Sequence, residues 1–138
     1  MTRRERILNV MAKKHQQRMA VISQELRTKQ DEIAVTADLS TRLQQLADET
    51  GAMKGPVSVG QLSGSMWLGR QLVSEIDKVR TRIAQVEEQA NGLRRDLSNE
   101  SQRERVVQDR AVEARHMARE EADARREAAN SSGLARRR

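Results

Sequence analysis

The chain has 138 residues and a formal net charge of +6, with 33% charged residues and 1% aromatic residues. A single Trp without Phe or Tyr cannot supply the aromatic surface that a compact core normally buries, so a globular domain is not expected. The absence of Cys excludes disulfides and thiolate metal sites, and a composition rich in helix formers favours long helices or a coiled coil.

The first predicted element is a helix over residues 2–50. Its apolar residues follow one another in steps of three or four with some irregularities, which is typical of a helix that buries one side. His15 continues this stripe from Met11, and Lys29 and Thr36 fall on or near it, so the stripe is weak. The apolar positions are Leu8, Met11, Met19, Ile22, Leu26, Ile33, Ala37, Leu43 and Leu46.

Residues 51–64 are predicted to form a loop. The segment GAMKGPVSVGQLSG holds four glycines and Pro56, which a long helix would not tolerate. Ser63 or Ser65 can cap the N-terminus of the helix that follows.

The second predicted helix covers residues 65–130 and contains the clearest pattern of the chain. Apolar residues alternate in steps of four and three, which places them in the narrow seam of a coiled coil. Beyond Leu97 the seam changes to acids and alanines, and the basic tail 131–138 is predicted to be disordered. The repeat consists of Leu72, Ile76, Val79, Ile83, Val86, Ala90, Leu93 and Leu97.

The predicted fold is all-α, with the two long helices of residues 1–130 in an antiparallel coiled-coil hairpin whose second helix is longer. Counting outward from the loop places Thr2 opposite roughly Glu113, so the end of the second helix lacks a partner within the chain. Residues 1–30 carry +6, residues 31–102 carry −3 and residues 103–138 carry +3. The end of the hairpin that holds both termini is therefore expected to be basic.

No constellation of residues indicates catalysis. His15 and His116 are isolated, and the glycines of the loop do not match a phosphate-binding loop. We expect no enzyme, no catalytic residues, no cofactor, no metal and no small-molecule substrate. The basic pI allows nucleic acid as a partner, but the nearly balanced charges and the lack of stacking aromatics argue against it.

Two features leave a structural and a functional interpretation open. Trp67 either packs over the hairpin turn and closes the seam, or it anchors a partner, because Trp is enriched among binding hot spots. The Arg-rich stretch 103–138 is either a helix kept soluble by ion pairs at i,i+4 or a helix that binds a partner through its Val and Ala stripe.

Targeting signals are weak. No apolar run approaches the length of a membrane-spanning helix, and the basic N-terminus lacks the apolar region of a secretory signal. A mitochondrial presequence shares the basic, amphipathic character of this N-terminus, although here the helical pattern continues past it.

The layout of a first helix, a glycine-rich turn, a Trp and a longer second helix resembles the flagellar export chaperone FliJ and its YscO-type relatives in type III secretion. The resemblance covers nearly the whole chain, and its closest local match is SMWLGRQLVSEIDKVRTRIAQ. It implies a cytoplasmic antiparallel coiled coil without catalytic activity, peripheral at the export gate of the inner membrane. Its partners would be the export ATPase ring and the export gate membrane protein.

The resemblance also suggests which residues bind. The gate contact falls on Leu72, Ile76, Val79 and Ile83, which are also seam positions. A match shifted by one residue gives Val73, Asp77, Arg80 and Ala84 instead. The other candidates for partner binding are Trp67 and the arginines of the basic end, namely Arg3, Arg4, Arg6, Arg110, Arg115 and Arg119. A structural or scaffolding coiled coil, including a parallel homodimer, is the alternative.

Overall fold

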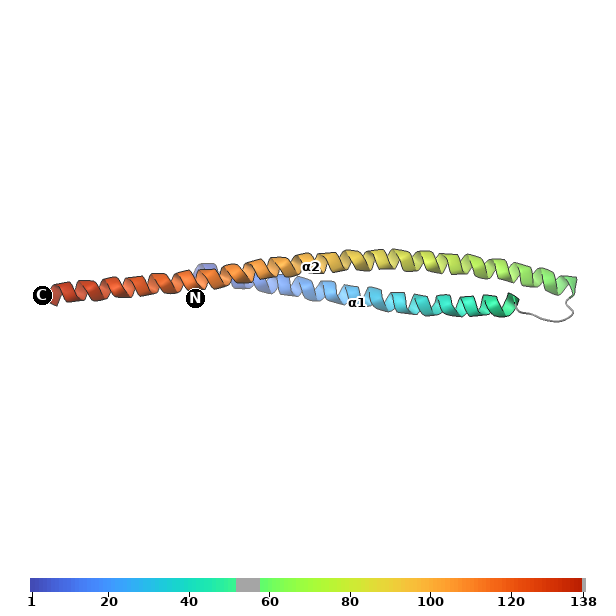
Figure 1. Ribbon diagram of the computed structural model, residues 1–138, viewed down its shortest axis with the longest axis horizontal. Helices are drawn as coiled ribbons and strands as arrows, with labels where there is room; N and C mark the ends of the chain where they lie inside the picture. The colour runs from blue at the N-terminus through green and yellow to red at the C-terminus, as the bar shows by residue number, and fades with distance from the viewer. Residues whose placement is uncertain (52–57, 138) are drawn as a thin grey trace. The chain divides into compact units, whose positions relative to one another are not determined.

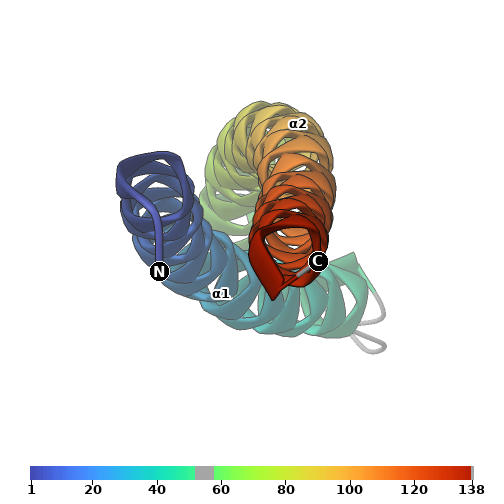
Figure 2. The same ribbon diagram turned by 90° about the vertical axis from the view of Figure 1, so that its left-hand side faces the viewer.

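The computed structural model describes residues 1–51 and 58–137, and these form two helices and no strand (Figure 1). Helix α1 spans Arg3–Gly51 and has 49 residues, and helix α2 spans Val59–Arg137 and has 79 residues. The view along the helices shows the same two elements (Figure 2). They pack against each other as a helical hairpin with a longer second helix, which confirms the predicted fold class.

Each helix begins with a capping box, in which a Ser or Thr and a Glu or Gln three residues later satisfy each other's backbone N–H groups. At α1 the Thr2 N–H donates to Glu5 Oε2 (3.1 Å) and the Glu5 N–H donates to Thr2 Oγ1 (3.2 Å). At α2 the Ser58 N–H donates to Gln61 Oε1 and the Gln61 N–H donates to Ser58 Oγ, both over 3.1 Å. These pairs fix where the helices start.

The predicted loop 51–64 is too long at its end, because α2 starts at Val59 rather than at residue 65. The capping box at Ser58 begins the helix, and Gly60 and Gly64 are then helical residues with open space where a Cβ would lie. The predicted end of the first helix at residue 50 is one residue early, since Gly51 is still helical. Residues 52–57 of the predicted loop lie outside the described residues.

The predicted disordered tail is wrong for residues 131–137, which continue α2 as far as Arg137. Gly133 lowers helix stability by about 1 kcal/mol relative to Ala, but without a Pro nothing in this segment blocks the helix. Residue 138 of the predicted tail lies outside the described residues.

The chain divides into two compact units, of which unit 2 comprises Ser23–Arg95. Within it α1 and α2 run antiparallel, and the Arg82 Nε–H donates to Glu32 Oε1 across them (3.1 Å). The α2 seam contains Leu72, Ile76, Val86 and Ala90 as buried residues, so the apolar repeat packs as predicted.

The α1 seam of unit 2 is more polar than predicted. Apart from Glu32, which accepts from Arg82, the half-buried side chains of α1 recur in steps of three and four. They are Leu26, Lys29, Ile33, Thr36, Ser40, Leu43, Ala47 and Thr50. The predicted positions Ala37 and Leu46 are exposed, with Leu46 45% exposed. Regular spacing decides which residues face α2, and the hydrophobicity of a neighbouring residue does not overrule it.

Unit 1 comprises Met1–Ile22 and Asp96–Arg138. Its apolar core is a small cluster of Leu8, Val107, Ala111 and Ala114, with Ala12 packed against it. The predicted seam residue Met11 is 41% exposed, and Ala12 takes its place. Because three of these five residues are alanines, the helices of unit 1 bury little apolar surface.

Candidate partner-binding surfaces

The four seam residues proposed for the gate contact face the chain's own first helix. Leu72 is 6% exposed and Ile76 is 5% exposed, and Val79 and Ile83 are half-buried. The set shifted by one residue, comprising Val73, Asp77, Arg80 and Ala84, is exposed throughout. A partner that binds the intact hairpin can therefore reach the shifted set but not the seam.

The first turns of α2 form an exposed apolar surface, here called the α2 entry surface. Arg70 is the only charged residue between positions 58 and 74, in a chain in which a third of all residues are charged. Apolar side chains lie on all sides of the helix here, so that one partner helix, α1, cannot cover them. The exposed members are Val59, Leu62, Met66, Trp67, Leu68 and Val73.

Trp67 is 63% exposed on this surface. A Trp that closes the seam would be largely buried, so its position favours the interpretation as an anchor for a partner. Exposed apolar patches of this kind are typical of interaction sites.

A groove lies beside the α2 entry surface, within unit 2. Small seam residues create it, because Ala47, Gly51 and Gly69 leave space between the helices. Leu62, Met66 and Val73 form its apolar rim, and Thr50 and Ser65 complete the lining. The groove is therefore lined mainly by small and apolar residues.

The six candidate arginines all belong to unit 1, and all are exposed. They are Arg3, Arg4, Arg6, Arg110, Arg115 and Arg119. Unit 1 holds sixteen Lys and Arg against ten Asp and Glu, whereas unit 2 holds ten of each. The whole net charge of +6 thus resides in unit 1, where it favours an acidic partner.

Among the described residues of unit 1, the end of α2 has no partner helix. Ala118 is half-buried, and every side chain from Arg119 to Leu134 is exposed. Local ion pairs support this segment, since His116 Nε2 lies 3.1 Å from Glu120 Oε1 and Arg126 Nη1 lies 4.0 Å from Asp123 Oδ1. Such pairs at i,i+4 and i,i+3 stabilise a solvated helix by a few tenths of a kcal/mol each, on the order of 0.2–0.5.

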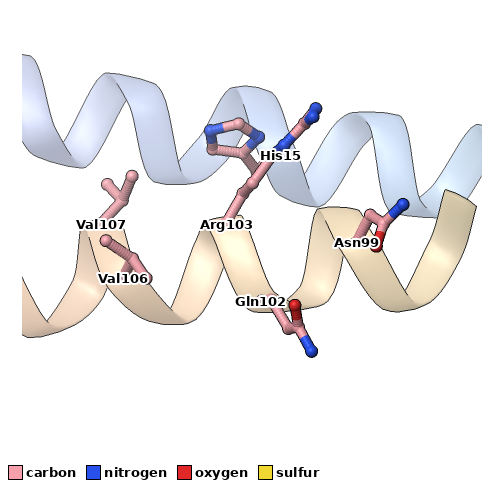
Figure 3. Close-up of a pocket in the computed structure, with 6 residues that line it drawn as sticks. All are labelled: His15, Asn99, Gln102, Arg103, Val106 and Val107. Atoms are coloured by element: carbon pink, nitrogen blue, oxygen red, sulfur yellow. The ribbon is translucent and has the colours of Figure 1, made fainter.

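A polar cluster interrupts the seam of unit 1. His15 Nδ1 lies 2.7 Å from Glu100 Oε2, and their side chains are only 13% and 9% exposed. Arg103 Nη1 donates to Glu100 Oε1 over 2.9 Å, and Arg18 Nη1 lies 3.9 Å from the same oxygen. Figure 3 shows the Arg103 side chain extending from α2 toward α1, which carries His15, whereas Gln102 points away from α1.

The environment of Glu100 favours its charged form. The hydrogen bond with His15, together with that from Arg103, lowers the pKa of the Glu100 carboxyl below its ordinary value of 4.5, although burial opposes this shift. One turn further along α2, Gln16 Nε2 donates to Glu104 Oε1 over 2.9 Å. In the sequence, His15, Glu100 and Glu104 all fall at predicted seam positions, but the sequence does not show that His15 pairs with Glu100.

Among residues 1–51 and 58–137, no group of three His, Asp or Glu side chains is placed to hold a metal ion. In the same part of the chain, neither helix has a stretch apolar enough to cross a membrane. No family model, curated protein or solved structure matches the sequence or the fold.

Proposed function

We propose that this chain is a non-enzymatic component of a flagellar or type III protein export apparatus, acting as a FliJ-like coiled-coil stalk. The observation that carries the proposal is the unpaired end of α2, which belongs to the unit that holds the entire net charge of the chain. A helix that extends beyond its own hairpin is suited to insertion into a partner.

The export ATPase ring is the partner proposed for unit 1. The exposed arginines can make charge-assisted hydrogen bonds to carboxylates of such a partner. Arg3, Arg4 and Arg6 come from α1, and Arg110, Arg115 and Arg119 come from α2. The alternation of Arg with Glu and Asp keeps the free helix soluble before it binds.

The export gate at the membrane is the partner proposed for unit 2, which would make the protein cytoplasmic and peripheral at the inner membrane. Leu72 and Ile76 are buried against α1, so we assign this contact to the exposed side of α2. Trp67 supplies the anchor, and Val73 continues the exposed apolar surface along the same helix.

Co-purification with the export ATPase of the same cell tests the first contact. We expect the full chain to bind the ATPase and to raise its activity, and a chain lacking residues 119–138 to lose both effects. The deletion leaves the buried positions of unit 1 intact, because every described side chain that it removes is exposed. Absence of binding by the full chain, or unchanged binding after the deletion, would contradict the proposal.

A matched pair of variants tests the second contact. Trp67→Ala is expected to weaken binding to the cytoplasmic domain of the export gate, while binding to the ATPase remains as in the wild type. Arg119→Ala together with Arg115→Ala is expected to show the opposite pattern. Loss of both contacts in each variant would indicate a general folding defect and would remove the assignment.

A scaffolding coiled coil is the second candidate. Three large apolar side chains on α1 point outward from the seam of unit 2, with Val35 72%, Leu39 47% and Leu46 45% exposed. Such residues favour association with a further helix. Sedimentation over a range of concentrations distinguishes the two, because a scaffold of this type self-associates through Leu39 and Leu46 without any export component.

A further inference from the structure

We propose that the His15–Glu100 pair sets the register of the two helices in unit 1 and thereby sets how much of α2 remains unpaired. The inference does not depend on the proposed function. The seam of unit 1 consists, on α1, of Glu5, Leu8, Ala12, His15, Met19 and Ile22.

Apolar packing supplies only a small part of the preference for one register in this unit, because its core is small. Leu8 packs against Val107, Ala111 and Ala114. A slip of one heptad toward the C-terminus of α2 places Leu8 against Ala114, Ala118 and Glu121 in place of Val107, Ala111 and Ala114. Leu8 would then keep contact with two alanines and lose its contact with Val107.

The polar cluster does distinguish between registers. In the observed register, Glu100 accepts from Arg103 and contacts His15, so that both of its carboxylate oxygens have partners. The same slip by one heptad would place Glu100 against Ile22 and His15 against Val107. Arg103 lies on the same helix and would move with Glu100, but the other carboxylate oxygen would lose His15. A buried carboxylate oxygen without a partner is disfavoured, so only the observed register satisfies both oxygens.

Register has a consequence for the exposed end of α2. A slip of seven residues shortens the unpaired segment by about 10 Å at 1.5 Å per residue. Coiled coils commonly use a single polar seam position to select one register, at some cost in stability. The His15–Glu100 pair has this role here, and it fixes the point on α2 opposite which α1 begins.

Disulfide trapping tests the inference directly, because the chain has no Cys of its own. Ala12→Cys with Val107→Cys reports the observed register, and Ala12→Cys with Ala114→Cys reports the register shifted by one heptad. In the otherwise unchanged chain we expect the first pair to form a disulfide and the second pair to remain reduced.

The decisive background is His15→Leu with Glu100→Leu, which makes the seam fully apolar and is expected to stay helical by circular dichroism. Here we expect the disulfide of the second pair to appear beside that of the first. The exchange His15→Glu with Glu100→His should shift cross-linking back toward the first pair, and His116→Leu, which changes an exposed His, should have no effect. If the double Leu variant cross-links only through the first pair, the inference is wrong.

Discussion

Truncation of Ile76 to Ala should lower the free energy of unfolding by about 3 kcal/mol. Ile76 is 5% exposed in the seam of unit 2. The substitution removes three buried carbon atoms, which at about 0.8 kcal/mol each amount to about 2.4 kcal/mol, and the cavity left behind adds to this value. Urea denaturation followed by circular dichroism at the helix band measures the difference.

Val73→Ala is the matched control, since Val73 is 56% exposed only three residues away on the same helix. A surface substitution of this kind should change the free energy of unfolding by less than about 0.5 kcal/mol. Equal effects for the two variants would refute the assignment of Ile76 to the seam. The exposed side of α2 would then not be the only side that a partner can reach.

Three other predictions concern acidity and the start of α2. The lowered pKa of Glu100 means that its ionised form stabilises the folded state above pH 4.5, and this stabilisation is lost as the pH falls through the lowered value. His15, Arg18 and Arg103 contact this carboxyl, and Glu104 follows one turn further along α2. Glu100→Gln should make the loss of stability at acid pH shallower in a titration between pH 7 and pH 3, and an unchanged profile would contradict the pairing. Ser58→Ala should lower the free energy of unfolding by about 1 kcal/mol in urea denaturation, because it removes the cap of α2. An unchanged free energy would show that this capping box contributes nothing to stability. Gly64→Ala should stabilise the chain by up to about 1 kcal/mol, because the site has open space for a Cβ, and a loss of stability would contradict a helical Gly64.

The sequence predicted the α2 seam well because every one of its positions from Leu72 to Leu97 is apolar and regularly spaced. It predicted the α1 seam less well because apolarity and spacing conflict there. Met11 and Leu46 are more apolar than Ala12 and Ala47, yet only the alanines continue the alternation of three and four residues. A strict heptad frame drawn through Leu8, Ile22 and Leu43 would have found the seam.

The start of α2 could also be predicted in part from the sequence. The pattern Ser58-x-x-Gln61 is a capping box, but Gly60 and Gly64 concealed it because glycines usually mark a turn. The His15–Glu100 pair was harder to predict, since the two residues lie 85 positions apart and only the register of the helices brings them together. Nothing in the spacing of a single helix carries that information.

In unit 2, α1 of the same chain occupies the α2 seam, so that partners bind elsewhere. The most direct test is the distance between spin labels at Gln44→Cys and Ser74→Cys, both exposed sites in unit 2, with the labelled chain diluted into an excess of unlabelled chain. We expect a single short distance that is unchanged by dilution. A distance that disappears on dilution would show that a second copy fills the seam, and it would contradict an intramolecular hairpin.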